Sequence, residues 1–283
     1  MPLSERNETA ATGTHAVSMR RPGEWRDIFP AHRLPVLVKT PIIVALGAYF
    51  AHADFQRAEL TGALILATLL WAALYALNEM TDVTEEQDYY VSQTIQSVLY
   101  TLPILVCVAS WFFSKALFLC LTAMTFGQYA YCVPAIRLKK YWLTIVLLSG
   151  ALNPLLRMQC GAIWGTQRIP LLAGTVFVLL HLGATFRART LQRDRDKRLA
   201  YHVAPRFSDW FGPVCTASGL VGAVVLCLQG ILPRFFILYI LIAGGFSAYA
   251  WSGRVHSMKT LRRGWIGFAL LALVALLLLA AAR

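Results

Sequence analysis

Long apolar stretches alternate with short polar segments along most of the chain. A helix needs about 20 consecutive apolar residues to cross the hydrocarbon of a bilayer, and nine stretches approach that length. They cover residues 36–53, 60–78, 94–113, 116–134, 142–164, 169–187, 212–231, 234–251 and 264–282. Several contain proline or glycine, which membrane helices tolerate where neighbouring helices satisfy the freed backbone groups. The pattern therefore predicts an all-α, polytopic membrane protein with nine transmembrane helices.

The composition supports this interpretation, since 58% of the 283 residues are hydrophobic and 14% are charged. A net charge of +12 would favour a nucleic-acid partner if basic residues alternated with aromatic ones on a polar face. The basic residues lie instead between the apolar stretches, so we expect membrane lipids as partners and no nucleic acid. The six cysteines lie in or beside apolar stretches without C-x-x-C spacing, which favours packing over metal binding or disulfides.

Basic residues also differ between the two sides of the predicted membrane. One set of alternate segments holds 20 Lys and Arg, and the other set with the C-terminus holds five. The first set comprises residues 1–40, 137–140, 187–206 and 254–263. Because cytoplasmic loops carry the basic excess, we expect a cytoplasmic N-terminus and an external C-terminus, in a bacterial inner (plasma) membrane. Residues 1–30 lack the apolar core of a signal peptide and are interpreted as a partly disordered cytoplasmic segment before one domain, residues 31–283.

The acidic residues form two clusters. Five of the 14 lie between Glu79 and Asp88, directly after the second apolar stretch. No Asp or Glu follows until Asp194, and none occurs after Asp209. Both clusters lie in segments that the basic residues place in the cytoplasm. Two groups of carboxylates at one membrane surface indicate a site for a divalent cation.

The first cluster has the spacing of one helix face. If the second stretch continues as a helix, Asn78, Asp82, Glu85 and Glu86 share a face, since spacings of four, seven and eight residues stack on a repeat of about 3.6. These side chains offer the hard oxygen ligands that Mg²⁺ prefers, with water and substrate phosphate completing its shell. We interpret all four as metal ligands and expect Asn78 and Asp82 to be catalytic. The alternative is a solvated loop whose acids balance nearby arginines.

The second cluster has the sequence FRARTLQRDRDKR. On a helix Asp194 shares a face with Arg187 and Thr190, whereas Asp196 lies about 200° away. The segment thus offers one well-placed carboxylate, Asp194, as a further metal ligand. Its guanidinium groups, Arg187 and Arg195 among them, suit phosphate oxygens, which Arg binds in a bidentate manner. The alternative is a basic cytoplasmic loop that binds no ligand.

These motifs resemble the UbiA superfamily of intramembrane prenyltransferases. The family pattern is N-x-x-x-D-x-x-x-D after the second helix and a second Asp-rich motif after the sixth. Asn78, Asp82 and Glu86 match the first motif, with Glu in the last place. The segment YAYCVPAIRLKKYW is similar to the family's segment after the fourth helix, and LNPLLRMQCGAIWG is similar to its fifth helix. The resemblance runs from about residue 20 to the end of the chain.

The second motif is where the chain departs from the family. Aligning the tripeptide RDR with the family's G-D-R places Asp194 on the last acid of the motif. Arg187 and Thr190 then stand where earlier aspartates are expected. The family's second Mg²⁺ site is therefore left without its usual ligands.

The resemblance implies a cavity between the helices in which Mg²⁺ holds an isoprenyl diphosphate on the cytoplasmic side. Breaking the allylic C–O bond leaves negative charge on pyrophosphate, which positioned cations stabilise. Arg157 lies inside the fifth apolar stretch, and a charge there marks a function by default. We expect Arg157 to be catalytic and to bind the diphosphate with Lys139 and Lys140, while Arg187 replaces the missing metal site. Snorkelling of Arg157 to lipid headgroups is the alternative.

The carbocation that ionisation produces needs a dry pocket lined by aromatic faces. Six aromatic residues of the apolar stretches are candidates: Trp71, Tyr75, Tyr129, Phe126, Trp164 and Phe177. The first three are the expected cation-stabilising residues, and each of the six has simple packing or lipid contact as its alternative. His181 is interpreted as a packed helix residue rather than a base.

Three classes of function follow from these features. The first is a prenyltransferase, in which an aromatic or lipid-like acceptor attacks the prenyl cation. The second is a terpene cyclase of the UbiA type, in which a double bond of the substrate attacks and no acceptor binds. The third is a transporter or other non-enzymatic membrane protein, which would leave the acidic and basic cytoplasmic segments unexplained. Prenyl transfer with Mg²⁺ is the function that we expect.

Overall fold

The computed structural model describes residues 22–23, 37–86, 90–133, 135–136, 138, 141–195 and 206–281. The helices of this part are α3 (Lys39–Phe50), α4 (Ala58–Glu86), α5 (Gln93–Trp111), α6 (Lys115–Cys132), α7 (Trp142–Thr144), η3 (Ile145–Leu152), α8 (Asn153–Ala162), α9 (Leu171–Arg195), α10 (Ser208–Leu228), α11 (Phe236–Trp251) and α12 (Met258–Ala281). The segments α7, η3 and α8 follow one another without a break and form one rod. The described part therefore contains nine helical rods, which confirms the predicted all-α fold.

Four helices contain segments long and apolar enough to cross a membrane: Ala58–Thr81, Gln93–Trp111, Leu171–Leu191 and Ser208–Leu228. The helices α3 and α11 are apolar but shorter. Two helices extend past their apolar segments. The helix α4 continues to Glu86 and α9 continues to Arg195, so both acidic motifs begin on helical backbone, as the spacing of the first cluster predicts.

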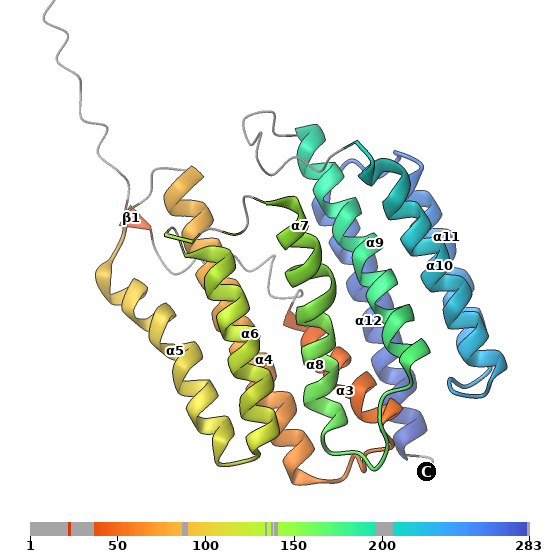
Figure 1. The fold of residues 1–283 in the computed structure, drawn as a ribbon. Coiled ribbons are helices and arrows are strands. Elements are labelled where there is room, and N and C mark those ends of the chain that lie inside the picture. The colour runs from red at the N-terminus through yellow and green to blue at the C-terminus, as the bar shows by residue number, and fades with distance from the viewer. Residues whose placement is uncertain are drawn as a thin grey trace, which may run out of the picture.

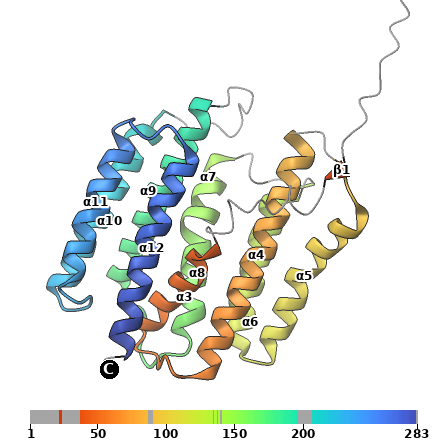
Figure 2. The same ribbon diagram turned by 180° about the vertical axis from the view of Figure 1, so that it is seen from behind.

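The rods run alternately up and down in one layered bundle (Figure 1). The helices α4, α5 and α6 form one side, α9 to α12 form the other, and α3 and α8 lie between them, as the reverse view in Figure 2 also shows. The C-terminal ends of α4 and α9 lie at the same end of the bundle (Figure 1). The two acidic motifs, which begin on these ends, therefore start on one side of the predicted membrane.

The pair α3 and α8 is held together by backbone contact. A Cβ atom on Gly47 would lie 1.8 Å from the carbonyl oxygen of Met158, and one on Gly161 would lie 1.9 Å from that of Val44. Small residues let membrane helices approach this closely. Met158 packs into the apolar cluster towards α9 to α11, whereas Cys160 packs into the cluster towards α4 to α6. The helix α8 thus separates two apolar clusters.

Of the N-terminal segment predicted to be partly disordered, the structure describes only Pro22–Gly23. These two residues form β1, which pairs in parallel with β2 (Tyr90–Val91). Pro22 lies opposite Tyr90, directly beyond the end of α4. Pro22 and Gly23 are therefore paired with residues that follow the first acidic motif in the chain.

Candidate functional site

Arg157 lies in the interior of the bundle, just after a break in helix geometry. The π-helical segment η3 ends where α8 begins, with Pro154 in the first turn of α8. Proline has no N–H, and its ring clashes with the carbonyl four residues before it in a regular helix. A wider turn avoids this clash, and π segments of this kind are frequent at functional sites. The sequence therefore fixes the position from which Arg157 projects.

The guanidinium group of Arg157 is enclosed by three helices. Its Nε donates to the carbonyl oxygen of Asn153 at 3.2 Å, and its Nη1 donates to Oγ1 of Thr40 on α3 at 3.5 Å. Its Cζ lies 4.2 Å from the centre of the Trp71 ring on α4. The residue is 3% exposed. Its head therefore does not reach lipid headgroups, which contradicts the snorkelling alternative.

Polar groups on these two turns of α8 are not fully hydrogen-bonded within the described part of the chain. Arg157 has five N–H donors, and only the two bonds above involve described residues. The side-chain amide of Asn153 is buried, and neither its nitrogen nor its oxygen has a hydrogen-bond partner among those residues. A buried polar group left in this state costs about 1–3 kcal/mol. The cluster has the character of a site for an anion with several oxygen atoms.

Asn78, the first residue of the predicted metal motif, faces α6. The thiol of Cys132 donates to its Oδ1 at 3.3 Å, and Gln128 donates to the sulfur of Cys132 at 3.0 Å. Asp82 and the two glutamates of the motif, Glu85 and Glu86, follow on the backbone of α4. Their side chains lie outside the described part of the chain, so their role as metal ligands stays a prediction. Among the described residues, no three His, Cys, Asp or Glu side chains form a metal group.

Two arginines of α9 contact opposite sides of the bundle. Arg187 is buried, donates from Nη2 to the carbonyl oxygen of Val255 at 3.0 Å and from Nη1 to Thr190 at 3.3 Å, and lies over the Trp251 ring. Arg189 instead donates from Nη2 to the hydroxyl oxygen of Tyr131 on α6 at 2.7 Å.

The Arg189–Tyr131 bond lies next to Cys132, the residue that contacts Asn78. Arg189 is not among the residues predicted from the sequence. A signal was present, since Arg187 and Arg189 are two residues apart on a helix, differ in direction by about 200° and therefore must face different neighbours. Asp194 and Arg195 lie on the α9 backbone, but their side chains are outside the described part. Lys139 and Lys140 are wholly outside it. The roles of these four residues stay predictions.

The six aromatic candidates lie in different surroundings. Trp71 contacts the Arg157 cation, and Tyr75 is half-buried on the next turn of α4. Tyr129 donates its hydroxyl to the carbonyl oxygen of Tyr100, and the two rings meet edge to face. Trp164 packs against the apolar cluster of α4 to α6. Phe126 is 72% exposed on the outer face of α6, so the interpretation of this side chain as a pocket lining is wrong.

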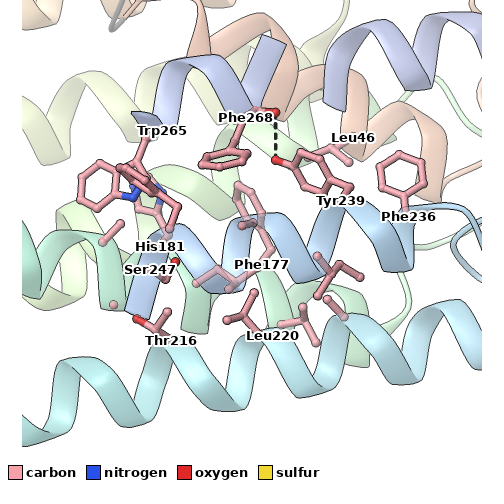
Figure 3. A pocket seen from close by; sticks show the side chains of 18 of the residues that line it. Leu46, Phe177, His181, Thr216, Leu220, Phe236, Tyr239, Ser247, Trp265 and Phe268 are labelled. Carbon is pink, nitrogen blue, oxygen red and sulfur yellow. Dashed lines mark hydrogen bonds between the residues drawn. The ribbon is translucent and has the colours of Figure 1, made fainter. Parts of the chain in front are cut away.

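A cavity of ≈ 300 Å³ lies on the opposite side of α3 and α8 from α4. Its walls come from α3, α9, α10, α11 and α12, with Leu232 from the connection between α10 and α11. Phe177 and His181 of α9 both line it, with their rings stacked at 6.1 Å (Figure 3). Phe177 therefore lines a cavity to which Trp71 and Asn78 of α4 do not contribute. All six cysteines are buried, as expected of packing residues.

The fold is that of solved UbiA homologues. No family model and no curated protein matches the chain. A UbiA homologue from Archaeoglobus fulgidus aligns with a TM-score of 0.67 at 14% identity, over 88% of this chain and 98% of the homologue. Its complex with GPP and Mg²⁺ aligns with a TM-score of 0.64 at 16% identity, over 90% and 99%. Digeranylgeranylglyceryl phosphate synthase aligns with a TM-score of 0.59 at 14% identity, over 90% and 96%. The chain therefore has the UbiA fold over most of its length.

Proposed function

We propose that the chain is a member of the UbiA superfamily, an integral membrane prenyltransferase that ionises an isoprenyl diphosphate and transfers the prenyl group to an acceptor. The observation that carries this proposal is the buried Arg157 cation, with the unpartnered side-chain amide of Asn153 one turn before it on α8. A diphosphate supplies both the negative charge and the oxygen acceptors that this cluster lacks among the described residues. The A. fulgidus homologue, whose structures contain DMAPP or GPP with Mg²⁺, supports this ligand class.

The donor groups of the first motif suit Mg²⁺. The amide oxygen of Asn78 lies at the inner end of the motif, on the helix that continues through Asp82 to Glu86. An amide and carboxylates are hard oxygen ligands, and Mg²⁺ binds one or two of them together with substrate phosphate. When bound there, Mg²⁺ would neutralise negative charge on the diphosphate.

The residues around Arg157 perform the first chemical step. The allylic C–O bond breaks, and its electron pair leaves with pyrophosphate. Arg157 stabilises that charge by donating N–H groups to the departing oxygens, a kind of interaction that contributes most where water is excluded. The Trp71 ring and the hydrogen bonds to Thr40 and Asn153 hold the guanidinium in place before the reaction. Arg157 is therefore assigned to the diphosphate, as its intramembrane position suggests.

The second step joins the prenyl group to the acceptor. A nucleophilic atom of the acceptor supplies the electron pair of the new bond to the prenyl carbon, and its proton passes to pyrophosphate. The apolar surroundings of the site protect the carbocation from water until this attack. The motif helices α4 and α9 end on the side to which the basic residues assign the cytoplasm, so water-soluble diphosphate groups enter from there.

Product analysis tests this function. Purified protein is incubated with Mg²⁺ and geranyl, farnesyl or geranylgeranyl diphosphate, with and without aromatic and lipid acceptors. The proposal predicts pyrophosphate release and a prenylated acceptor. A cyclic hydrocarbon or terpene alcohol as the main product in every mixture would favour a terpene cyclase and contradict transfer. Release of no pyrophosphate from any of the three would refute both enzymatic functions.

A further inference from the structure

The cavity between α3 and α9 to α12 is a compartment separate from the first metal motif. Every residue that lines it belongs to those helices or to the connection between α10 and α11. The helix α4, which carries Asn78, contributes no lining residue from its described part. The pair α3 and α8 stands between α4 and the cavity, as Figures 1 and 2 show. A donor held at Asn78 and Arg157 therefore leaves this volume for another ligand.

One end of the cavity is cationic and aromatic. Lys39 at the start of α3 and Arg187 of α9 both line it. The Lys39 Nζ lies 5.2 Å from the centre of the Trp265 ring, and the Arg187 Cζ lies 5.5 Å from that of Trp251. Aromatic faces hold such cations in place. Two positive groups within a mostly apolar wall match the charge of an anionic head group.

The rest of the cavity is apolar and elongated. Its walls extend along α3 from Lys39 to Phe50, a rise of about 16 Å in a helix. In Figure 3, Trp265 and His181 lie towards one end, and Tyr239 and Phe236 lie towards the other. The hydroxyl of Tyr239 is used within the protein, since it donates to the carbonyl oxygen of Phe268 at 2.9 Å. This part of the cavity suits a hydrocarbon chain.

The cationic end adjoins the site that contains Arg157. Lys39 lines the cavity, while the next residue, Thr40, accepts the hydrogen bond from Arg157. His181 of α9 also lines the cavity. The head of a ligand in the cavity would therefore lie next to the place where the donor ionises.

We propose that this cavity is the acceptor compartment and that the acceptor is an amphiphile with an anionic head and one apolar chain. This inference rests on the proposed transferase function and names its acceptor class. Lys39 and Arg187 hold the head, and the chain lies between α9 and α11. Arg187 therefore belongs to the acceptor rather than to the diphosphate of the donor. The attacking atom lies near the head, because that end adjoins Arg157.

Binding of matched single-chain probes tests the compartment. The full-length protein is placed in nanodiscs of zwitterionic lipid and titrated with dodecyl phosphate or dodecanol, with binding read by native mass spectrometry. Because hydrogen bonds to charged groups are stronger than neutral ones, dodecyl phosphate should bind at least about tenfold more tightly than dodecanol. Geranyl diphosphate with Mg²⁺, added at the same saturating concentration to both titrations, should not displace dodecyl phosphate. Equal binding of the two probes, or competitive displacement by the donor, would overturn the proposal.

Substitutions locate the probe. Lys39→Gln and Arg187→Gln should each weaken dodecyl phosphate binding about tenfold and leave dodecanol binding unchanged; Lys39→Gln covers the case in which Arg187→Gln fails to fold. Ala243→Trp fills the cavity from α11 and should abolish binding of both probes, whereas the control Leu241→Trp, on the exposed face of the same helix, should not. Unchanged binding in Ala243→Trp would overturn the proposal.

The failure of the proposed function gives a different result. If the wild-type protein binds dodecyl phosphate as expected but releases no pyrophosphate from any isoprenyl diphosphate, the transferase function and the acceptor role are both refuted. If pyrophosphate is released but dodecyl phosphate does not bind, only the acceptor compartment is refuted. The preference for dodecyl phosphate over dodecanol also distinguishes a specific site from a gap that is simply filled by bilayer lipid. Such a gap would bind both probes equally well.

Discussion

Replacing Arg157 by methionine should separate its role in catalysis from any role in stability. The substitution removes a hydrogen bond to Asn153 that contributes about 1 kcal/mol, a weaker one to Thr40, and a desolvated contact with Trp71 that contributes about 2 kcal/mol. It also removes a charge whose burial at the centre of a membrane helix costs about 2.5–3.5 kcal/mol. These opposing contributions nearly cancel. We therefore expect the thermal midpoint of the donor-free protein to change little.

The same substitution should strongly reduce turnover. Two charge-assisted hydrogen bonds to the diphosphate contribute about 1.5–3 kcal/mol each, so kcat/KM should fall by about a hundredfold to ten-thousandfold. Pyrophosphate release measures kcat/KM, and tryptophan fluorescence during heating measures stability. Arg234→Met, on an exposed residue of the connection before α11, is the matched control and should change neither. Wild-type turnover in Arg157→Met would refute the assignment, and a large loss of thermal stability with normal turnover would show a structural role instead.

Three further comparisons test the site and the helix packing around it. Because the second motif lacks its usual acids, Asp82→Ala should abolish pyrophosphate release, whereas Asp194→Ala should only reduce it; equal loss in both would contradict the dominant role of the first motif. Arg189→Gln should raise the KM of the donor more than it lowers kcat, because it removes the bond from α9 to α6; an unchanged KM would exclude this positioning role. Gly161→Ala should destabilise the protein, since its Cβ meets backbone 1.9 Å away, whereas Gly245→Ala meets nothing within 4 Å and should not. Circular dichroism during heating compares these two glycine variants, and equal midpoints would contradict the close packing of α3 and α8.

The sequence predicts the order and the extent of the helices well, because polar segments must lie outside the hydrocarbon. The second predicted stretch, 60–78, corresponds to α4, and its continuation as a helix is confirmed to Glu86. The buried position of Arg157 also agrees with the sequence, in which apolar residues flank this charge on both sides. The direction in which the Arg157 side chain points cannot be predicted from the sequence. The structure shows its guanidinium group over the Trp71 ring.

The sequence does not reveal which side of a membrane helix faces the protein. Lipid tails are as apolar as the core, so periodicity does not distinguish Phe126, which faces outward, from Phe177, which lines a cavity. The bond between Arg189 and Tyr131 likewise depends on where the tertiary fold places the last turns of α9 relative to the end of α6. The cavity is formed by α3 together with α9 to α12. Because these helices are far apart along the chain, no local sequence motif reveals it.

The most direct test of the central claim is the dependence of pyrophosphate release on Mg²⁺. Purified protein is mixed with geranyl, farnesyl or geranylgeranyl diphosphate, first in EDTA and then after excess Mg²⁺ is added, and inorganic pyrophosphate is measured over time. We predict release only after Mg²⁺ is added, and none from Asp82→Ala under the same conditions. Release that is absent with all three substrates, or that proceeds equally in EDTA, would contradict a Mg²⁺-dependent prenyl diphosphate enzyme.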